Sequence, residues 1–139
     1  MSKFDPIYRR SLEQMEGFWA EAAADIHWDK PWEKVLDESN APFYRWFSGG
    51  QLNTCYNALD RHVENGRGDQ AALIYDSPIT GGQQTRSYKV LRDETARFAG
   101  ALVAHGVGKG ARFILYQPTV PEPIAAMLAC ARVGRADFV

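Results

Sequence analysis

The 139-residue sequence predicts an α/β fold, in which a helical N-terminal region precedes the start of a parallel or mixed sheet. Two patterns predict it. Apolar residues recur with a helical period between residues 4 and 26, and the second half alternates short strand-like runs with longer helical patterns. Alternating strands and helices are typical of crossovers between parallel strands. We therefore expect a β-hairpin followed by βα units.

The N-terminal region begins with an amphipathic helix. Asp5 can cap it, and Pro6 suits its first position. Its apolar stripe continues for about six turns. Such a stripe must cover another domain or the rest of the chain. The stripe consists of Phe4, Ile7, Tyr8, Leu12, Met15, Phe18, Trp19, Ala22, Ala23 and Ile26.

Large aromatic residues follow, in a segment where Pro31 and Pro42 argue against a long regular element. Aromatic rings can stack on nucleic-acid bases, but this segment is acidic. We therefore favour an extended arm that its rings hold against a neighbouring surface. The rings are Trp28, Trp32, Phe43, Tyr44, Trp46 and Phe47, and the acidic residues are Asp29, Glu33, Asp37 and Glu38.

Turn and cap residues divide the remaining chain into elements. After Gly49-Gly50, Asn53 can cap a helix that Asn65-Gly66 ends. Ser87 can cap a long amphipathic helix that ends at His105-Gly106. The other expected elements are a hairpin of strands 71–75 and 83–87 around the turn 78–82, a strand over 112–116 and the start of a strand over 136–139. Before that last strand, we expect a buried helix that starts at Pro121-Glu122-Pro123, is almost wholly apolar over 124–133 and ends at Gly134.

Composition excludes several classes of protein. Sixteen basic and seventeen acidic residues, well interspersed, predict no nucleic acid or anionic membrane as partner. Charges at Arg9, Arg10 and Glu13 exclude a secretory signal peptide, and the longest apolar run, 124–131, is too short to span a bilayer. We expect a soluble cytoplasmic protein. Cys55 and Cys130 lack CxxC spacing, which predicts two reduced, buried thiols rather than a disulfide or a metal site.

One glycine-rich segment, Gly106-Val107-Gly108-Lys109-Gly110, has the composition of a phosphate-binding loop. A phosphate loop needs a strand before the glycines and a helix after them, so that free N–H groups face the anion. Here the order is reversed, which favours a helix C-cap and a turn. The paired glycines of segment 78–83 lie between two expected strands and favour a hairpin turn.

Titratable residues form no catalytic pattern. Asp60, His62 and Glu64 cluster on one helix, but His27 and His105 lie in other elements, so capping, salt bridging or packing is favoured over metal binding. Gly-x-Ser-x-Gly is absent. Glu122 is placed to interact with the dipole of its own helix. We predict no catalytic, cofactor-binding or metal-binding residue in this chain.

The tract from Phe43 to Asn53, continued from Tyr56 to Val63, resembles the N-terminal region of acetyl-CoA and propionyl-CoA synthetases, which are AMP-forming acyl-CoA ligases. Phe18-Trp19 and Trp32 resemble the same N-terminal extension, and the opening is most similar to the propionyl-CoA members. The second half resembles the start of the family's large adenylate-forming domain, at Ser87-Tyr88, Ala96-Arg97-Phe98-Ala99, Leu102, Gly106 to Gly110 and Met127 to Gly134.

This resemblance implies a division into residues 1–65, the synthetase-type extension, and residues 66–139, the truncated start of the AMP-binding domain. Family members convert propionate or acetate, ATP and CoA into acyl-CoA, AMP and pyrophosphate through an acyl-adenylate, with Mg as cofactor. Their nucleotide loop, acidic ribose-binding residue and C-terminal catalytic Lys have no counterpart here, and their glycine-rich CoA loop would begin after Val139. The fragment is therefore expected to be inactive and to bind no cofactor.

Several residues depart from the family pattern. Ala111 stands where Asp is usual, and Gln117 and Thr119 stand where Met is common. Arg135 and Asp137 lie in a strand that normally has small or apolar residues. Unpaired charges buried in such a strand would cost several kcal/mol each.

The alternative is a non-catalytic docking module. A fragment cut within its sheet should aggregate, whereas a module should melt as one soluble unit. The sequence does not decide whether propionate or acetate is the substrate of the full-length enzyme, nor does it give the oligomeric state.

Overall fold

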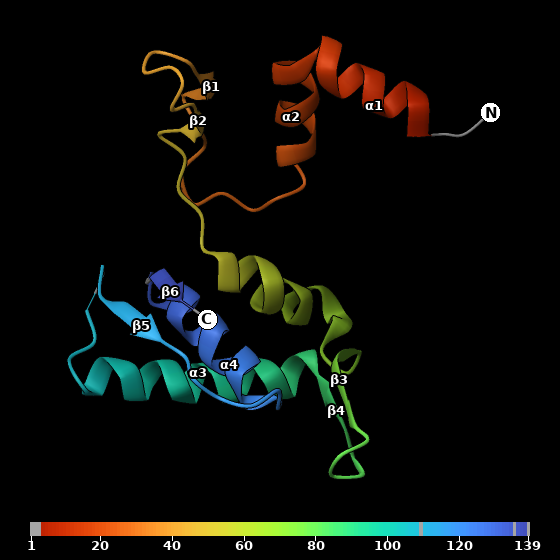
Figure 1. Ribbon diagram of the computed structural model, residues 1–139, viewed down its shortest axis with the longest axis vertical. Helices are drawn as coiled ribbons and strands as arrows, with labels where there is room; N and C mark the ends of the chain where they lie inside the picture. Colours follow the sequence, from red (N-terminus) through yellow and green to blue (C-terminus); the bar gives the residue numbers. More distant parts are fainter. Residues whose placement is uncertain (1–3, 109, 135, 139) are drawn as a thin grey trace. The chain divides into compact units, whose positions relative to one another are not determined.

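A computed structural model describes residues 4–108, 110–134 and 136–138 of the chain (Figure 1). The chain divides into two compact units, Met1–Leu52 and Asn53–Val139. Helices open the first unit, and strands and helices alternate in the second, which confirms the predicted α/β class. Lys109, Arg135 and Val139 lie outside the described residues.

The first unit opens with two helices, α1 (Phe4–Glu13) and α2 (Met15–Ala23), where the sequence predicted one continuous helix. The backbone leaves helical geometry at Gln14, with φ −125° and ψ 48°. An ion pair joins Arg10 to Glu21, residues that a straight helix would hold about 16 Å apart along its axis. The bend brings them together, as the angle between α1 and α2 shows (Figure 1).

Helix α1 leaves its apolar face uncovered within the described chain. It begins at Phe4, so Asp5 and Pro6 lie in its first turn rather than before it, and the expected Asp5 cap is wrong. None of its residues is buried. Ile7 and Leu12 are each more than half exposed.

Two short strands, β1 (Lys34–Asp37) and β2 (Arg45–Ser48), pair antiparallel in the segment that was expected to be irregular. Leu36 lies opposite Trp46, and a further bridge joins Lys30 to Gln51. Each strand has only four residues, too few for an alternating pattern to be recognised in the sequence.

Half-buried aromatic rings form a cluster in the first unit. The rings of Trp28, Trp32 and Phe47 lie with centroids 5.0 to 5.5 Å apart, and Trp28 Nε1 donates to the Ala23 carbonyl at 2.9 Å. A Cβ on Gly50 would lie 2.6 Å from the Trp28 ring. These rings pack on one another within the unit, so the expected extended arm is instead a small folded cluster.

The second unit opens with a helical segment of two π-helical stretches, η1 (Tyr56–Asp60) and η2 (Val63–Arg67). Asn53 Oδ1 accepts a hydrogen bond from the Tyr56 N–H at 3.0 Å, which confirms the predicted cap. Gly66 has φ +80°, a conformation that glycine adopts without strain, and interrupts the helical backbone where the sequence predicted a stop.

A hairpin and the longest helix follow. Strands β3 (Ala71–Ser77) and β4 (Gly82–Ser87) pair antiparallel, as predicted. Helix α3 (Tyr88–Ala104) begins where Ser87 Oγ accepts a hydrogen bond from the Val90 N–H at 3.4 Å. The predicted serine cap is thus confirmed.

The last elements are β5 (Arg112–Ile114), α4 (Glu122–Arg132) and β6 (Ala136–Phe138). Strands β5 and β6 pair in parallel across α4, with Phe113 opposite Asp137, which confirms the predicted crossover. Of the charges expected in this strand, Arg135 lies outside the described residues. Within the described ranges, strands form three two-stranded sheets.

Small buried side chains let α3 and α4 approach closely, and the two helices lie side by side in Figure 1. One core cluster joins Ala99 and Leu102 of α3 to Ala129 and Cys130 of α4. A second contains Cys55, Leu59, Leu91 and Ala125. The predicted buried helix and the predicted burial of both thiols, Cys55 and Cys130, are therefore confirmed. No helix among the described residues is long and apolar enough to cross a membrane.

Candidate functional site

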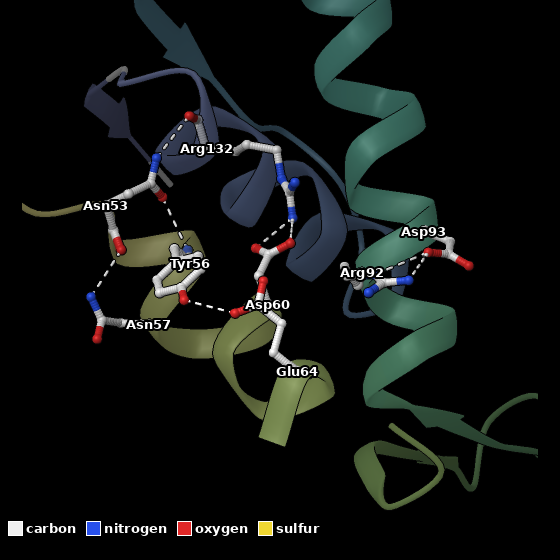
Figure 2. A network of polar contacts seen from close by, with 8 residues as sticks. All are labelled: Asn53, Tyr56, Asn57, Asp60, Glu64, Arg92, Asp93 and Arg132. Carbon is white, nitrogen blue, oxygen red and sulfur yellow. Dashed lines mark hydrogen bonds and ion pairs between the residues drawn. The ribbon is translucent and has the colours of Figure 1, made fainter. Parts of the chain in front are cut away.

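A polar network joins the start of the helical segment 53–67 to the last turn of α4 (Figure 2). Arg132 Nη2 lies 2.9 and 2.8 Å from the two carboxylate oxygens of Asp60. Their side chains are 26% and 19% exposed. Asn53 Nδ2 donates to the Arg132 carbonyl at 3.0 Å. Asn53 also caps the helical segment 53–67, so its side chain bonds to the start of that segment and to the last residue of α4. The network therefore holds these two helix ends together.

Cys55 lies beside this network and is fully buried. Burial raises the pKa of the Cys55 thiol, although the neighbouring Arg132 acts in the opposite direction. The group is therefore protonated at neutral pH, and a protonated, inaccessible thiol is not a nucleophile.

The cluster of Asp60, His62 and Glu64 is divided among separate partners. Tyr56 donates its hydroxyl to Glu64 Oε2 at 2.7 Å, and this contact raises the pKa of Tyr56. The His62 ring packs on Tyr88, with centroids 5.0 Å apart. Salt bridging and packing, the roles favoured from sequence, are confirmed. In the part of the chain that the structure describes, no group of three His, Cys, Asp or Glu side chains could hold a metal ion.

Protonation of His62 is disfavoured by its surroundings. Its pKa is lowered from 6.5 by burial and by the positive charges of Arg67 and Arg61. Arg67 Nη1 lies 3.2 Å from His62 Nδ1. Since a guanidinium only donates hydrogen bonds, Nδ1 accepts here and carries no proton.

The glycine-rich turn after α3 is a helix C-terminus. The Gly106 N–H donates to the Val103 carbonyl at 2.9 Å, and the Val107 N–H donates to the Leu102 carbonyl at 3.0 Å. This pair of bonds is the Schellman arrangement, in which Gly106 adopts φ +75°. The end of α3 presents carbonyls rather than N–H groups, so its dipole disfavours an anion. The prediction of a C-cap is confirmed.

A pocket of about 560 Å³ lies in the second unit between α3 and the N-terminal half of α4. Arg86 Nε is 3.2 Å from Glu94 Oε2, and Arg86 Nη2 is 3.2 Å from Glu122 Oε1. Glu122 is the first residue of α4, as the dipole argument required, and it also pairs with Arg86. The polar lining is Arg86, Glu94, Arg97, Gln117 and Glu122, and the apolar lining is Phe98, Ala101, Ala125 and Ala126.

Sequence reasoning missed this pocket. Arg86 lies in β4, and its partner Glu122 lies 36 residues later in the chain. No motif or spacing marks such a pair in a single sequence. The residues that line the pocket include no Ser, Thr, Cys or Lys beside a His that could act as its base.

Two family models match the chain in succession. Residues 4–58 match the acetyl-coenzyme A synthetase N-terminus, and residues 59–138 match the AMP-binding enzyme family. A human relative, the mitochondrial acyl-CoA synthetase short-chain family member 3, is 46% identical over 133 residues, which are 96% of this chain and 19% of the relative. An acetyl-coenzyme A synthetase of Cupriavidus pinatubonensis is 50% identical over 141 residues, covering 100% of this chain and 21% of that protein.

The fold is also found in a solved structure. Acetoacetyl-CoA synthetase from Streptomyces lividans superposes with a TM-score of 0.86 at 29% identity, over 99% of this chain and 21% of that one. The chain thus spans about a fifth of the length of the relatives that it matches. The chain belongs to the AMP-binding enzyme family, in which it corresponds to the N-terminal portion of acetyl- and short-chain acyl-CoA synthetases.

Proposed function

We propose that this chain is part of a short-chain acyl-CoA synthetase that acts on propionate in preference to acetate. The observation that carries the proposal is the uninterrupted succession of the two family models over residues 4–138. Relatives that are 45 to 50% identical to it bear the names acetyl-coenzyme A synthetase and acyl-CoA synthetase short-chain family member 3. The preference for propionate rests on the resemblance of the opening tract.

The proposed reaction has two steps. A carboxylate oxygen attacks the α-phosphorus of ATP, the bond to the β-phosphate breaks and pyrophosphate leaves. Mg²⁺, when bound to the parent enzyme, would neutralise charge on the phosphates. The sulfur of CoA then attacks the acyl carbon of the adenylate, AMP leaves and the thiol proton passes to water. None of the residues described above is assigned a step. We propose that they shape the scaffold, beginning with strands β5 and β6 and the helix α4 between them.

The division into residues 1–65, the extension, and 66–139, the start of the AMP-binding domain, remains part of the proposal. Gly66 is exposed and lies where the helical segment changes direction. Limited proteolysis tests the division, because a boundary here predicts early cleavage within a few residues of Gly66. Protection of this glycine, with cleavage elsewhere, would contradict it.

We further propose that the 139 residues alone are catalytically inactive and that the parent enzyme is cytoplasmic. The test incubates the purified chain with ATP, Mg²⁺, CoA and either propionate or acetate, and measures AMP and pyrophosphate release. An intact acetyl-CoA synthetase serves as the positive control. We expect no release above the rate without carboxylate. Turnover with propionate would show that the chain itself is an enzyme and would overturn the proposed inactivity.

One observation favours a second candidate, a non-catalytic docking module. Helix α1 buries none of its residues, and Phe4, Ile7 and Tyr8 are 65%, 55% and 53% exposed. Exposed apolar side chains aligned on one helix face are typical of an interaction surface. A module predicts sharp, reversible melting of a monomer. Concentration-dependent aggregation before melting would instead support a part of a larger domain.

A further inference from the structure

Asn65 and Gly66 form the one Asn-Gly pair of the sequence, and they lie where the helical segment 53–67 is interrupted. Asn65 has φ −81° and ψ 16°, and Gly66 has φ +80°. Both residues are exposed, and a Cβ on Gly66 would meet no atom within 4 Å. The Asn65 side chain and the backbone of Gly66 are therefore accessible to solvent.

Asn65 differs from the other asparagines of the chain in its contacts and its neighbour. Its side chain makes no hydrogen bond with any residue that the structure describes. Asn53 and Asn57 both hold their side-chain amides in hydrogen bonds, of 3.0 and 3.1 Å. Asn40 is exposed like Asn65, but Ala41 follows it instead of glycine. Only Asn65 combines an exposed, unbonded side chain with a following glycine.

An asparagine in this setting can react with its own backbone. The Gly66 nitrogen loses its proton to hydroxide and attacks Cγ of Asn65. A C–N bond forms, the bond from Cγ to Nδ2 breaks, and the leaving nitrogen takes a proton from water, so that ammonia departs and hydroxide is regenerated. Water then opens the five-membered succinimide at either carbonyl, which gives aspartate or isoaspartate. Glycine favours the attack because it places no Cβ beside the nitrogen and lets the backbone rotate.

The interruption of the helix makes the required rotation possible. In a regular helix the backbone N–H groups are held by carbonyls one turn earlier, and φ and ψ have fixed values. Asn65 and Gly66 have already left these values. Neither residue belongs to the hydrophobic core clusters of the described chain, so the ring can close without disturbing the core.

We propose that Asn65 is a site of spontaneous deamidation in the folded chain, which converts it to aspartate and isoaspartate through a succinimide with Gly66. Either product adds one negative charge to a chain whose formal net charge is −1. Isoaspartate also lengthens the main chain, because the chain then passes through Cβ. The reaction needs only water and this chain's own residues, so it does not depend on the proposed synthetase function.

The experiment incubates the folded 139-residue chain at neutral and at mildly alkaline pH and follows each asparagine by tryptic peptide mapping with mass spectrometry. Trypsin places Asn65 in peptide 62–67 and Asn40 in peptide 35–45, each without a second asparagine. We expect Asn65 to react at least about tenfold faster than Asn40, the ratio that a barrier difference of about 1.4 kcal/mol gives. The rate should rise in proportion to hydroxide concentration, and enzymatic methylation should detect isoaspartate in peptide 62–67.

The chain unfolded in urea is the reference for the effect of the fold. Because the fold leaves the pair exposed, the folded and unfolded rates at Asn65 should agree within about fivefold, which corresponds to a local opening free energy of about 1 kcal/mol or less.

Two variants test the roles of the two residues. Gly66→Asn adds a side chain beside the attacking nitrogen but tolerates the positive φ, and it should slow the reaction of Asn65 about tenfold. Asn65→Gln would have to close a larger ring and should remove the fast release of ammonia from peptide 62–67.

Other outcomes would overturn the proposal. Equal rates at Asn65 and Asn40 would show that the following glycine and the helix break have no effect. Reaction of Asn65 in urea without reaction in the folded chain would show that the fold protects the pair. An unchanged rate in Gly66→Asn, with the fold intact by circular dichroism, would remove the role assigned to Gly66.

Discussion

The ion pair between Asp60 and Arg132 should contribute strongly to the stability of the second unit. Its side chains are only 19% and 26% exposed, and one guanidinium nitrogen touches both carboxylate oxygens within 2.9 Å. Removing one partner of a fully buried pair costs about 3–5 kcal/mol, because a buried charge is left unpaired. Residual exposure reduces this penalty, and we expect Asp60→Asn or Arg132→Met to cost about 2–3 kcal/mol each.

Urea unfolding followed by circular dichroism at 222 nm measures this effect. With an m value of about 1.5 kcal/mol per molar urea, each variant should lower the midpoint by about 1.3–2 M. All four tryptophans, Trp19, Trp28, Trp32 and Trp46, lie in the first unit, so tryptophan fluorescence follows that unit separately.

The double variant tests the reasoning. If the penalty of each single change is mainly an unpaired charge, then removing both charges should cost at least about 1 kcal/mol less than the sum of the two. Arg92→Met is the control, since its exposed pair with Asp93 should contribute less than about 0.5 kcal/mol. Additive effects of the two single changes would refute the assignment of the stability to this pair.

Three further predictions concern local structure. Asn53→Ala removes both the cap and the bond to the Arg132 carbonyl, and should lower the free energy of unfolding, followed by circular dichroism, by about 1–2 kcal/mol. Asn53→Asp keeps the capping oxygen and should lose less. Gly50→Ala places a Cβ 2.6 Å from the Trp28 ring and should destabilise the first unit by about 1–3 kcal/mol, seen in its fluorescence transition; an unchanged midpoint would contradict this packing. Burial and Arg67 lower the pKa of His62 below 6.5, so the unfolded chain binds more protons than the folded chain just below that pH. The free energy of unfolding should therefore fall as the pH drops from about 6.5 to the lowered pKa. His62→Gln should flatten this part of the curve of stability against pH.

Local signals in the sequence predicted most element boundaries of the second unit. The caps at Asn53 and Ser87 and the stop at Gly106 depend on hydrogen bonds within five residues, and each is found where it was predicted. The first unit was harder to predict. No proline marks the break at Gln14 in the sequence. The two strands have four residues each, too few for an alternating pattern of apolar and polar residues to stand out.

The sequence by itself determined the fold class, the family and the order of strands and helices from Ala71 onward, because caps, turns and apolar periodicity act between near neighbours in the chain. Only the tertiary structure decided the bend at Gln14, the ion pair of Asp60 with Arg132 and the pocket around Arg86. The partners of those two arginines lie 72 and 36 residues away. Their contacts exist because packing of the helices and strands brings together side chains that are far apart in the sequence, which no local pattern encodes.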